Sequence, residues 1–303
     1  MSEERLVPLG REDGRSAEGG RPRRRFLGSR ARVEWPAPKP RGVGEQLDFA
    51  FELLRANFLG YVGIAFVLWL PVRIVAAIQG PINTDPMVAE VSDQLAFLGQ
   101  FIAQIMVQLF VVAFATAMVQ RDLMGQEKTT GQVMGTVLRR LPAFFLLSFL
   151  VGLLGGIGVF ACCIGVYFVS WKLQLAVPAF VVENASVGES LNRTWHLTKG
   201  SLLRWLGLYH LVQFIQLPLS SLAGVPYEPL VRDVIDESLG LSRVVFEAII
   251  VPLSSLYLAI PTALIGVAFT VFYFDQRVRL EGYDLELALA RLKARDSESE
   301  LSE

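Results

Sequence analysis

The sequence predicts an all-α fold, a polytopic membrane helix bundle with six transmembrane helices, interfacial amphipathic helices and parallel helix-hairpin repeats. The first observation is composition: 52% of the 303 residues are hydrophobic and 19% are charged, whereas soluble domains average about 45–50% apolar and about 25% charged. The second is that long apolar segments fill the chain after residue 57. The third is that the polar segment 186–200 repeats the pattern of segment 42–57.

Six segments are apolar and long enough to cross a bilayer, which takes about 20 residues of helix. In chain order they are 58–79, 94–119, 142–160, 164–182, 202–224 and 244–273. The apolar run from Pro142 to Val182 is too long for one span, so we expect it to fold back within the stretch GVFACCIGV. Prolines inside several of these segments are compatible with spanning helices, because neighbouring helices satisfy the freed backbone groups.

The composition divides the chain into three parts. Residues 1–40 are rich in Arg, Gly and Pro without apolar periodicity and predict a disordered, basic cytoplasmic tail. Residues 41–290 form the predicted six-span membrane domain, and residues 291–303 predict an acidic, disordered C-terminal tail.

The basic residues predict the orientation, since loops on the cytoplasmic side carry the Lys and Arg excess. All but four of the 28 Lys and Arg lie before the first span, between the second and third, between the fourth and fifth, or after the sixth. The exceptions are Arg73, Lys172, Arg232 and Arg243. The pattern therefore predicts a multi-pass protein of the inner (cytoplasmic) membrane with both termini in the cytoplasm.

Three short polar segments predict amphipathic helices that each open a repeat unit. Val43-Gly44-Glu45 matches Val187-Gly188-Glu189, and each segment leads directly into an apolar span. Ser186 with Glu189 has the spacing of a capping box, and Thr129 with Gln132 opens a third candidate copy. Each unit holds two spans, so successive units enter the membrane in the same direction and predict parallel repeats. The alternative is chance similarity between interfacial helices.

Polar side chains within the apolar segments predict either interhelical hydrogen bonds or a polar cavity. Intramembrane ionisable groups are costly and usually face the bundle interior. Lys172 falls near the middle of the fourth segment, so we expect it to point inward, towards glutamine or histidine partners. The candidate cavity residues are Arg73, Gln100, Gln104, Gln108, Lys172, His210 and Gln213.

Two other patterns have simpler interpretations. Gly152 and Gly156 form a GxxxG motif, which predicts close helix packing in the third span. Cys162 and Cys163 are adjacent, a spacing unsuited to a normal disulfide. With two Cys and two His in the chain, the sequence predicts no metal site and no cofactor.

The chain from about 42 to 290 resembles the glycerophosphoryl diester phosphodiesterase membrane domain family and related bacterial membrane proteins. The likeness is carried by GVGEQLDFAFELLRANFLGYV, by LAVPAFVVENASVGESLNRTWHLTKGSLLRWLG and by YFDQRVRLEGYDLELAL. The resemblance implies a six-span protein. The catalytic phosphodiesterase barrel fused to some relatives would need about 250 residues, so we expect no phosphodiesterase activity here.

The sequence favours a non-enzymatic membrane protein of unassigned molecular activity that organises the membrane or binds lipid or partners. We expect contact with the lipid bilayer and anionic headgroups, and no nucleic-acid partner. The alternative is a transporter or lipid-handling protein with a polar intramembrane cavity around Lys172. An enzyme would need a nucleophile–base pair or acid cluster, and the only candidate, His196, is more typical of a surface residue.

Overall fold

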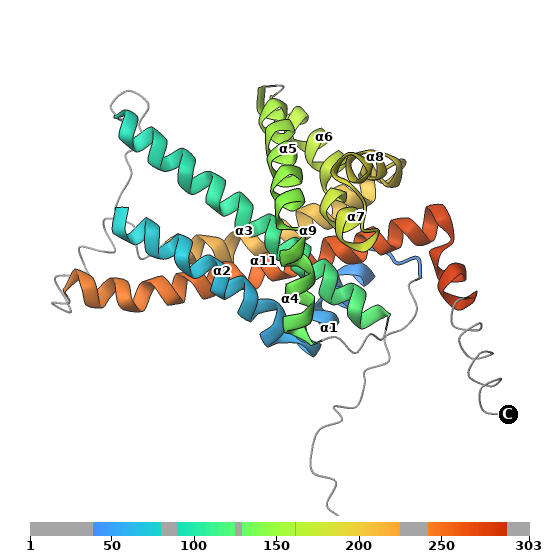
Figure 1. The fold of residues 1–303 in the computed structure, drawn as a ribbon, viewed down its shortest axis with the longest axis horizontal. Helices are drawn as coiled ribbons and strands as arrows, with labels where there is room; N and C mark the ends of the chain where they lie inside the picture. The colour runs from blue at the N-terminus through green and yellow to red at the C-terminus, as the bar shows by residue number, and fades with distance from the viewer. Residues whose placement is uncertain (1–38, 80–89, 125–128, 161, 225–241, 290–303) are drawn as a thin grey trace, which may run out of the picture. The chain divides into compact units, whose positions relative to one another are not determined.

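The computed structural model describes residues 39–79, 90–124, 129–160, 162–224 and 242–289. Within these ranges the chain is helical and contains no strand. The helices, labelled as in Figure 1, are α1 (Val43–Ala56), α2 (Phe58–Gln79), α3 (Val91–Leu123), α4 (Thr130–Arg139), α5 (Leu141–Phe160), α6 (Cys162–Leu173), α7 (Ala176–Val182), α8 (Val187–Leu197), α9 (Leu202–Gly224) and α11 (Arg243–Glu281). Both predicted tails lie outside the described residues, apart from the first tail's last two positions.

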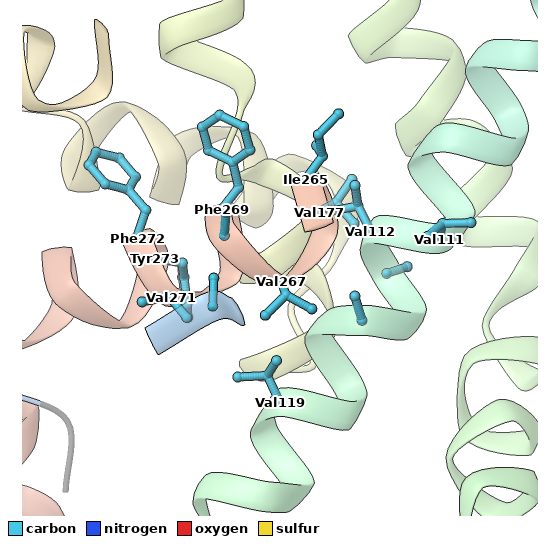
Figure 2. Close-up of a cluster of buried hydrophobic side chains, with 14 of the residues drawn as sticks. Val111, Val112, Val119, Val177, Ile265, Val267, Phe269, Val271, Phe272 and Tyr273 are labelled. Atoms are coloured by element: carbon cyan, nitrogen blue, oxygen red, sulfur yellow. The ribbon is translucent and has the colours of Figure 1, made fainter. Parts of the chain in front are cut away.

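The C-terminal helix α11 is the centre of the packing, and it contacts α1, α2, α3 and α9 along its length. Figure 1 shows α2 and α3 crossing it obliquely near the middle of the molecule. Figure 2 shows the core where α11 meets α3: Ile265, Val267 and Phe269 lie beside Val112 and Val119. These side chains are buried, and the β-branched residues give this interface stiff, well-defined rotamers.

Close approach of α11 to its neighbours depends on one glycine and several hydroxyl groups. A Cβ placed on Gly266 would lie 2.8 Å from the Cβ of Ala115 and 3.3 Å from the Cα of Val112. One turn away, the hydroxyls of Thr116 and Thr270 lie 2.9 Å apart. Small residues and side-chain hydrogen bonds are the usual means of holding helices together where lipid surrounds them.

Among the described residues, four helices are long and apolar enough to cross a membrane: α2, α3, α5 and α11, over Phe58–Gln79, Val91–Leu123, Leu141–Gly158 and Val244–Glu281. Only 22% of the most apolar stretch of α2 is buried inside the protein. Its Leu59 and Ile78 are 83% and 78% exposed. Exposed apolar surface on this scale marks a membrane or partner contact rather than a water-facing surface.

The predicted fold-back within the long apolar run is confirmed. Helix α5 ends at Phe160, α6 begins at Cys162, and the two helices pack against each other. A Cβ on Gly158 would lie 3.0 Å from the carbonyl oxygen of Gly165. A larger residue at position 158 would push the two helices apart, so their close approach depends on this glycine.

The expected fourth span is interrupted, because α6 stops at Leu173 and α7 starts at Ala176. The cause is Pro178: it lacks the N–H that would bond to the carbonyl of Gln174, and its ring blocks that carbonyl. The pieces hold 12 and 7 residues, about 18 Å and about 10 Å of helix. Neither piece is long enough to cross a bilayer alone.

The predicted close packing at Gly152 and Gly156 is wrong. A Cβ on either glycine would meet no atom within 4 Å. The exposed apolar side chains Phe149, Leu153 and Ile157 lie on the same helix. The close contacts occur instead at Gly158 and Gly266, which the GxxxG pattern does not mark.

Each of the three short polar segments forms a helix that leads into a longer one: α1 precedes α2, α4 precedes α5, and α8 precedes α9. Capping boxes start α4 and α8, where Thr129 accepts from the Gln132 N–H and Ser186 from the Glu189 N–H. Gly42 has no side chain, so α1 keeps only the reverse half, in which Glu45 accepts the Gly42 N–H at 3.0 Å.

Candidate functional site

Glu183 is the centre of an ion-pair cluster that joins α7, α8 and α11, and we call it the Glu183 cluster. Glu183 caps the C-terminus of α7. It accepts from Arg193 Nε at 2.8 Å and from the Tyr273 hydroxyl at 2.6 Å. The Arg193 guanidinium also donates to the Glu281 carboxylate at 2.6 Å. Arg277 donates to the same carboxylate at 3.1 Å. One guanidinium therefore links two carboxylates on different helices.

The charge state of Arg193 follows from these contacts. Burial alone would lower the pKa of its guanidinium, but the hydrogen bonds that it donates to Glu281 and Glu183 outweigh burial and raise that pKa above its usual value. Arg193 is therefore cationic at every accessible pH. It serves as a permanent electrostatic tie between helices rather than as a proton donor.

Asp275 forms a second cluster, the Asp275 cluster, which ties the N-terminus of α1 to α11 and α9. Its carboxylate accepts from the Arg41 N–H at 2.8 Å, from Arg279 at 2.8 Å and from Arg204 at 3.2 Å. Arg279 also donates to the carbonyl of Arg41 at 2.8 Å. The Asp275 side chain is 1% exposed, and a carboxylate buried to this extent needs such partners.

The C-terminal end of α6 is joined to α8 by buried hydroxyl groups. The Thr194 hydroxyl donates to the carbonyl of Lys172 at 2.7 Å, which satisfies one of the carbonyls left open at the end of α6. Trp171 donates to Ser201 at 3.2 Å. Thr194, Thr198 and Ser201 are all fully buried, so α8 is fixed against α6 by hydrogen bonds as well as by packing.

Lys172 lies at this junction, buried to 8% exposure. Its ammonium donates to the Thr198 hydroxyl at 3.2 Å. It also lies 3.9 Å from the ring centre of Trp171 and 5.1 Å from that of Trp195. Lys172 lines an open polar pocket of about 780 Å³, together with Glu183, Asn184, Ala185, Glu189, Asn192, Arg193, Trp195, His196 and Lys199.

The structure distributes the predicted cavity residues rather than gathering them around Lys172, and none of the other six lines its pocket. Arg73 donates to Ser254 of α11 at 3.2 Å. His210 stacks on Tyr167 of α6 at 5.7 Å, with its Nε2 3.4 Å from the Tyr167 hydroxyl. The remaining residues are half-buried on α3 and α9: Gln100, Gln104, Gln108 and Gln213.

The expected partners of Lys172 also differ from those observed. Lys172 is the second-to-last residue of α6, since the helix ends at Leu173. It therefore lies at a helix end beside α8, where its partners are a threonine and two tryptophans rather than glutamine or histidine. Lys172 lies near the middle of the apolar segment 164–182, but this position did not reveal the helix break that Pro178 causes.

A second pocket, of about 580 Å³, lies between α2 and α11. Its lining is apolar apart from Glu247 and includes Leu70, Ile74 and Ile78 of α2 and Val244 and Val251 of α11. It lies near the N-terminal end of α11, whereas both carboxylate clusters involve its C-terminal end. The apolar pocket and the two carboxylate clusters thus lie at different ends of this helix.

Sequence reasoning flagged most of the cluster residues through the family resemblance, but not their pairing. The threonines and Ser201 that join α6 to α8 were missed. The available signal was the spacing of Thr194 and Thr198, at i and i+4, which places them on one face of α8 and its C-cap. Ser201 lies beyond the turn that ends α8, so helical spacing could not have found it.

The fold and these clusters define a class: over the residues that the structure describes, the protein is helical, with four helices able to cross a membrane and a charged network at helix ends. Comparison with protein-family models, with curated proteins and with solved structures found no match for the chain. The resemblance to the membrane-domain family stays a prediction.

Proposed function

We propose that this chain is a non-enzymatic, multi-pass protein of the inner membrane that organises lipid or binds partners at its charged end. The observation that carries the proposal is the separation of surfaces. Large apolar side chains such as Leu59, Ile78 and Phe214 are exposed along the long helices. The carboxylate clusters join the short helices α1, α7 and α8 to the C-terminal end of α11.

The proposal includes six spans: α2, α3, α5, the α6–α7 pair, α9 and α11. Helix α9 has 23 residues, and its Leu203 and Phe214 are 82% and 80% exposed, as expected of lipid-facing side chains. Helices α6 and α7 together cover the length that neither covers alone. Six spans place the basic connections and both termini on one side, the cytoplasm.

The proposal also includes three parallel repeat units, α1–α3, α4–α7 and α8–α11. Their packing is cyclic: α4 contacts α3, α8 contacts α6 and α7, and α1 contacts α11. Each short helix therefore packs on the second half of the preceding unit, and the first packs on the last. This order supports the repeat proposal, chiefly through the contact of α1 with α11, which are distant in the sequence.

We also propose that the chain is a member of the glycerophosphoryl diester phosphodiesterase membrane domain family, because residues that carry the resemblance contact one another. Residues that carry the resemblance meet in the two clusters: Glu183, Arg193, Asp275, Arg277, Arg279 and Glu281. Their carboxylates are engaged by arginines, an arrangement that holds helices together and leaves no free acid pair for glycoside- or phosphoester-type chemistry at these positions.

Reporter fusions test the architecture directly. A reporter active only in the cytoplasm, fused after residues 127, 186 and 290, should be active, and one fused after residues 85 and 235 should be inactive. Full-length protein should stay in the membrane pellet after alkaline carbonate extraction. Extraction into the supernatant would reject the membrane proposal, and activity at residue 235 would reject the six-span count.

The alternative is a transporter or lipid-handling protein that uses Lys172, and the observation that favours it is the burial of this cation beside a pocket of about 780 Å³. The substitution Lys172→Leu, with normal membrane insertion, should abolish solute flux into proteoliposomes if Lys172 lies on the path. Unchanged flux would remove this alternative.

A further inference from the structure

The pocket beside Lys172 contains a buried cation that the carboxylates of the pocket do not pair with. Lys172 is buried, and among the described residues it forms no ion pair with a carboxylate. An ammonium has three N–H donors, and Thr198 accepts from one of them. Lys199 lines the same pocket and acts on Lys172 as a like charge.

The acidic residues of the pocket are already engaged elsewhere. Glu183 accepts hydrogen bonds from Arg193 and Tyr273. Glu189 turns back to the start of its own helix, where its carboxylate accepts the Ser186 N–H at 2.8 Å. Neither carboxylate forms an ion pair with Lys172 or Lys199. Lys172 is thus a buried cation without a counterion, which is costly, and Lys199 adds an exposed positive charge to the same pocket.

The aromatic surroundings place the pocket where a membrane-anchored ligand could reach it. Trp195 is 48% exposed and packs edge-on against Phe168, which is 47% exposed. Tryptophan side chains concentrate at the membrane–water boundary, because their amphipathic rings sit at the level of the headgroups. The pocket therefore has cations and the Asn192 amide on its polar side and exposed aromatic rings beside them.

We propose that Lys172 and Lys199 bind the phosphate group of an anionic ligand in this pocket, with the headgroup of an anionic phospholipid as the favoured source. Lysine binds phosphate as a point charge without fixed geometry, which suits a mobile headgroup. The pocket volume of about 780 Å³ exceeds what a phosphate alone requires and leaves room for the adjoining glycerol. This inference rests on the proposed membrane function, since it takes the ligand from the bilayer.

The test is calorimetric titration of the purified full-length protein in uncharged detergent with three probes: short-chain phosphatidic acid, short-chain phosphatidylcholine and inorganic phosphate. We expect saturable binding of phosphatidic acid, weakened about tenfold or more by Lys172→Gln, because a hydrogen bond to a charged group is lost. Lys199→Gln, at an exposed position, should weaken binding in the same direction. Lys172→Arg should largely retain it.

Arg139→Gln is the matched control, because Arg139 is exposed on α4 and does not line the pocket; its binding should equal that of the wild type. Equal affinity for inorganic phosphate, with the same dependence on Lys172, would keep the anion site and assign it to soluble phosphate. No binding of either anion, or binding indifferent to Lys172→Gln and Lys199→Gln, would overturn the proposal. Carbonate extraction of the same protein shows separately whether the membrane proposal holds.

Discussion

The Asp275 and Glu183 clusters hold short helices in place by different means. Asp275 is 1% exposed and ties the start of α1 to a helix 234 residues further along the chain. Glu183 is 22% exposed and accepts hydrogen bonds from Arg193 of α8, 10 residues away, and from Tyr273 of α11, 90 residues away. Helix α8 also has its own Ser186 cap, whereas α1 begins at Gly42. Helix α1, which lacks a side-chain acceptor at its N-cap, is thus held at its start by a distant, buried carboxylate.

The largest effect should come from Asp275→Asn. The substitution removes the buried negative charge opposite Arg204 and Arg279, and breaking such a pair costs about 3 kcal/mol. The free energy of unfolding in mixed micelles should fall by about this amount. Asp48→Asn, at an exposed position on α1, is the control and should change stability little. Equal stability of the two variants would show that Asp275 does not hold α1.

Arg193→Gln should have the next largest effect. It removes a guanidinium that contacts both Glu183 and Glu281, but these groups are partly exposed and water can replace the lost contacts. We expect a loss of about 1–2 kcal/mol in the same unfolding measurement, smaller than for Asp275→Asn. A loss larger than that of Asp275→Asn would reverse the ranking of the two clusters. Arg139→Gln again provides the matched loss of one charge.

Tyr273→Phe removes a single donor to Glu183, the hydroxyl at 2.6 Å. Because Arg193 still pairs with Glu183, we expect a loss of about 1 kcal/mol in the free energy of unfolding. Tyr257→Phe on the same helix serves as the control, since no hydrogen bond of its hydroxyl is seen. Identical curves for the two variants would mean that the Tyr273 hydroxyl contributes nothing to the Glu183 cluster.

The smallest effect concerns the local cap of α8. Hydrogen bonds from Ser186 hold the pKa of Glu189 below its usual value. The folded pKa is thus below the unfolded value of about 4.3, so this stabilisation is full above that pH and is lost as the pH falls through the folded pKa. Thermal melting between pH 6 and pH 3 should therefore drop slightly more in the wild type than in Glu189→Gln. A larger drop in the variant would contradict the sign.

Local features were predictable from the sequence because they depend on near neighbours. The bounds 58–79 and 202–224 match α2 and α9, and the caps at Thr129 and Ser186 are where the spacing placed them. The break before Pro178 could not be predicted from the presence of the proline. Pro71 and Pro218 also lie inside apolar segments, yet their helices are continuous. Hydropathy alone does not distinguish these cases.

The candidate site was less predictable because its contacts join distant segments. Arg193 and Glu281 were visible as charges, but which of several arginines would meet which carboxylate depends on how each helix is rotated about its axis. The same applies to Gly266, which is needed only because α3 passes against it. Lys172 was singled out correctly as unusual, yet its environment depended on where α6 ends.

The bond between the Arg41 amide and Asp275 has a consequence for biosynthesis. When α1 leaves the ribosome, 234 residues still separate Arg41 from its acceptor. At about 5–20 residues per second, that delay is roughly ten to fifty seconds. During this interval α1 can contact α2 and later α9, but α11, its largest docking surface, is missing. Much of its apolar face must therefore rest on the bilayer surface or on an assisting factor until translation is nearly finished.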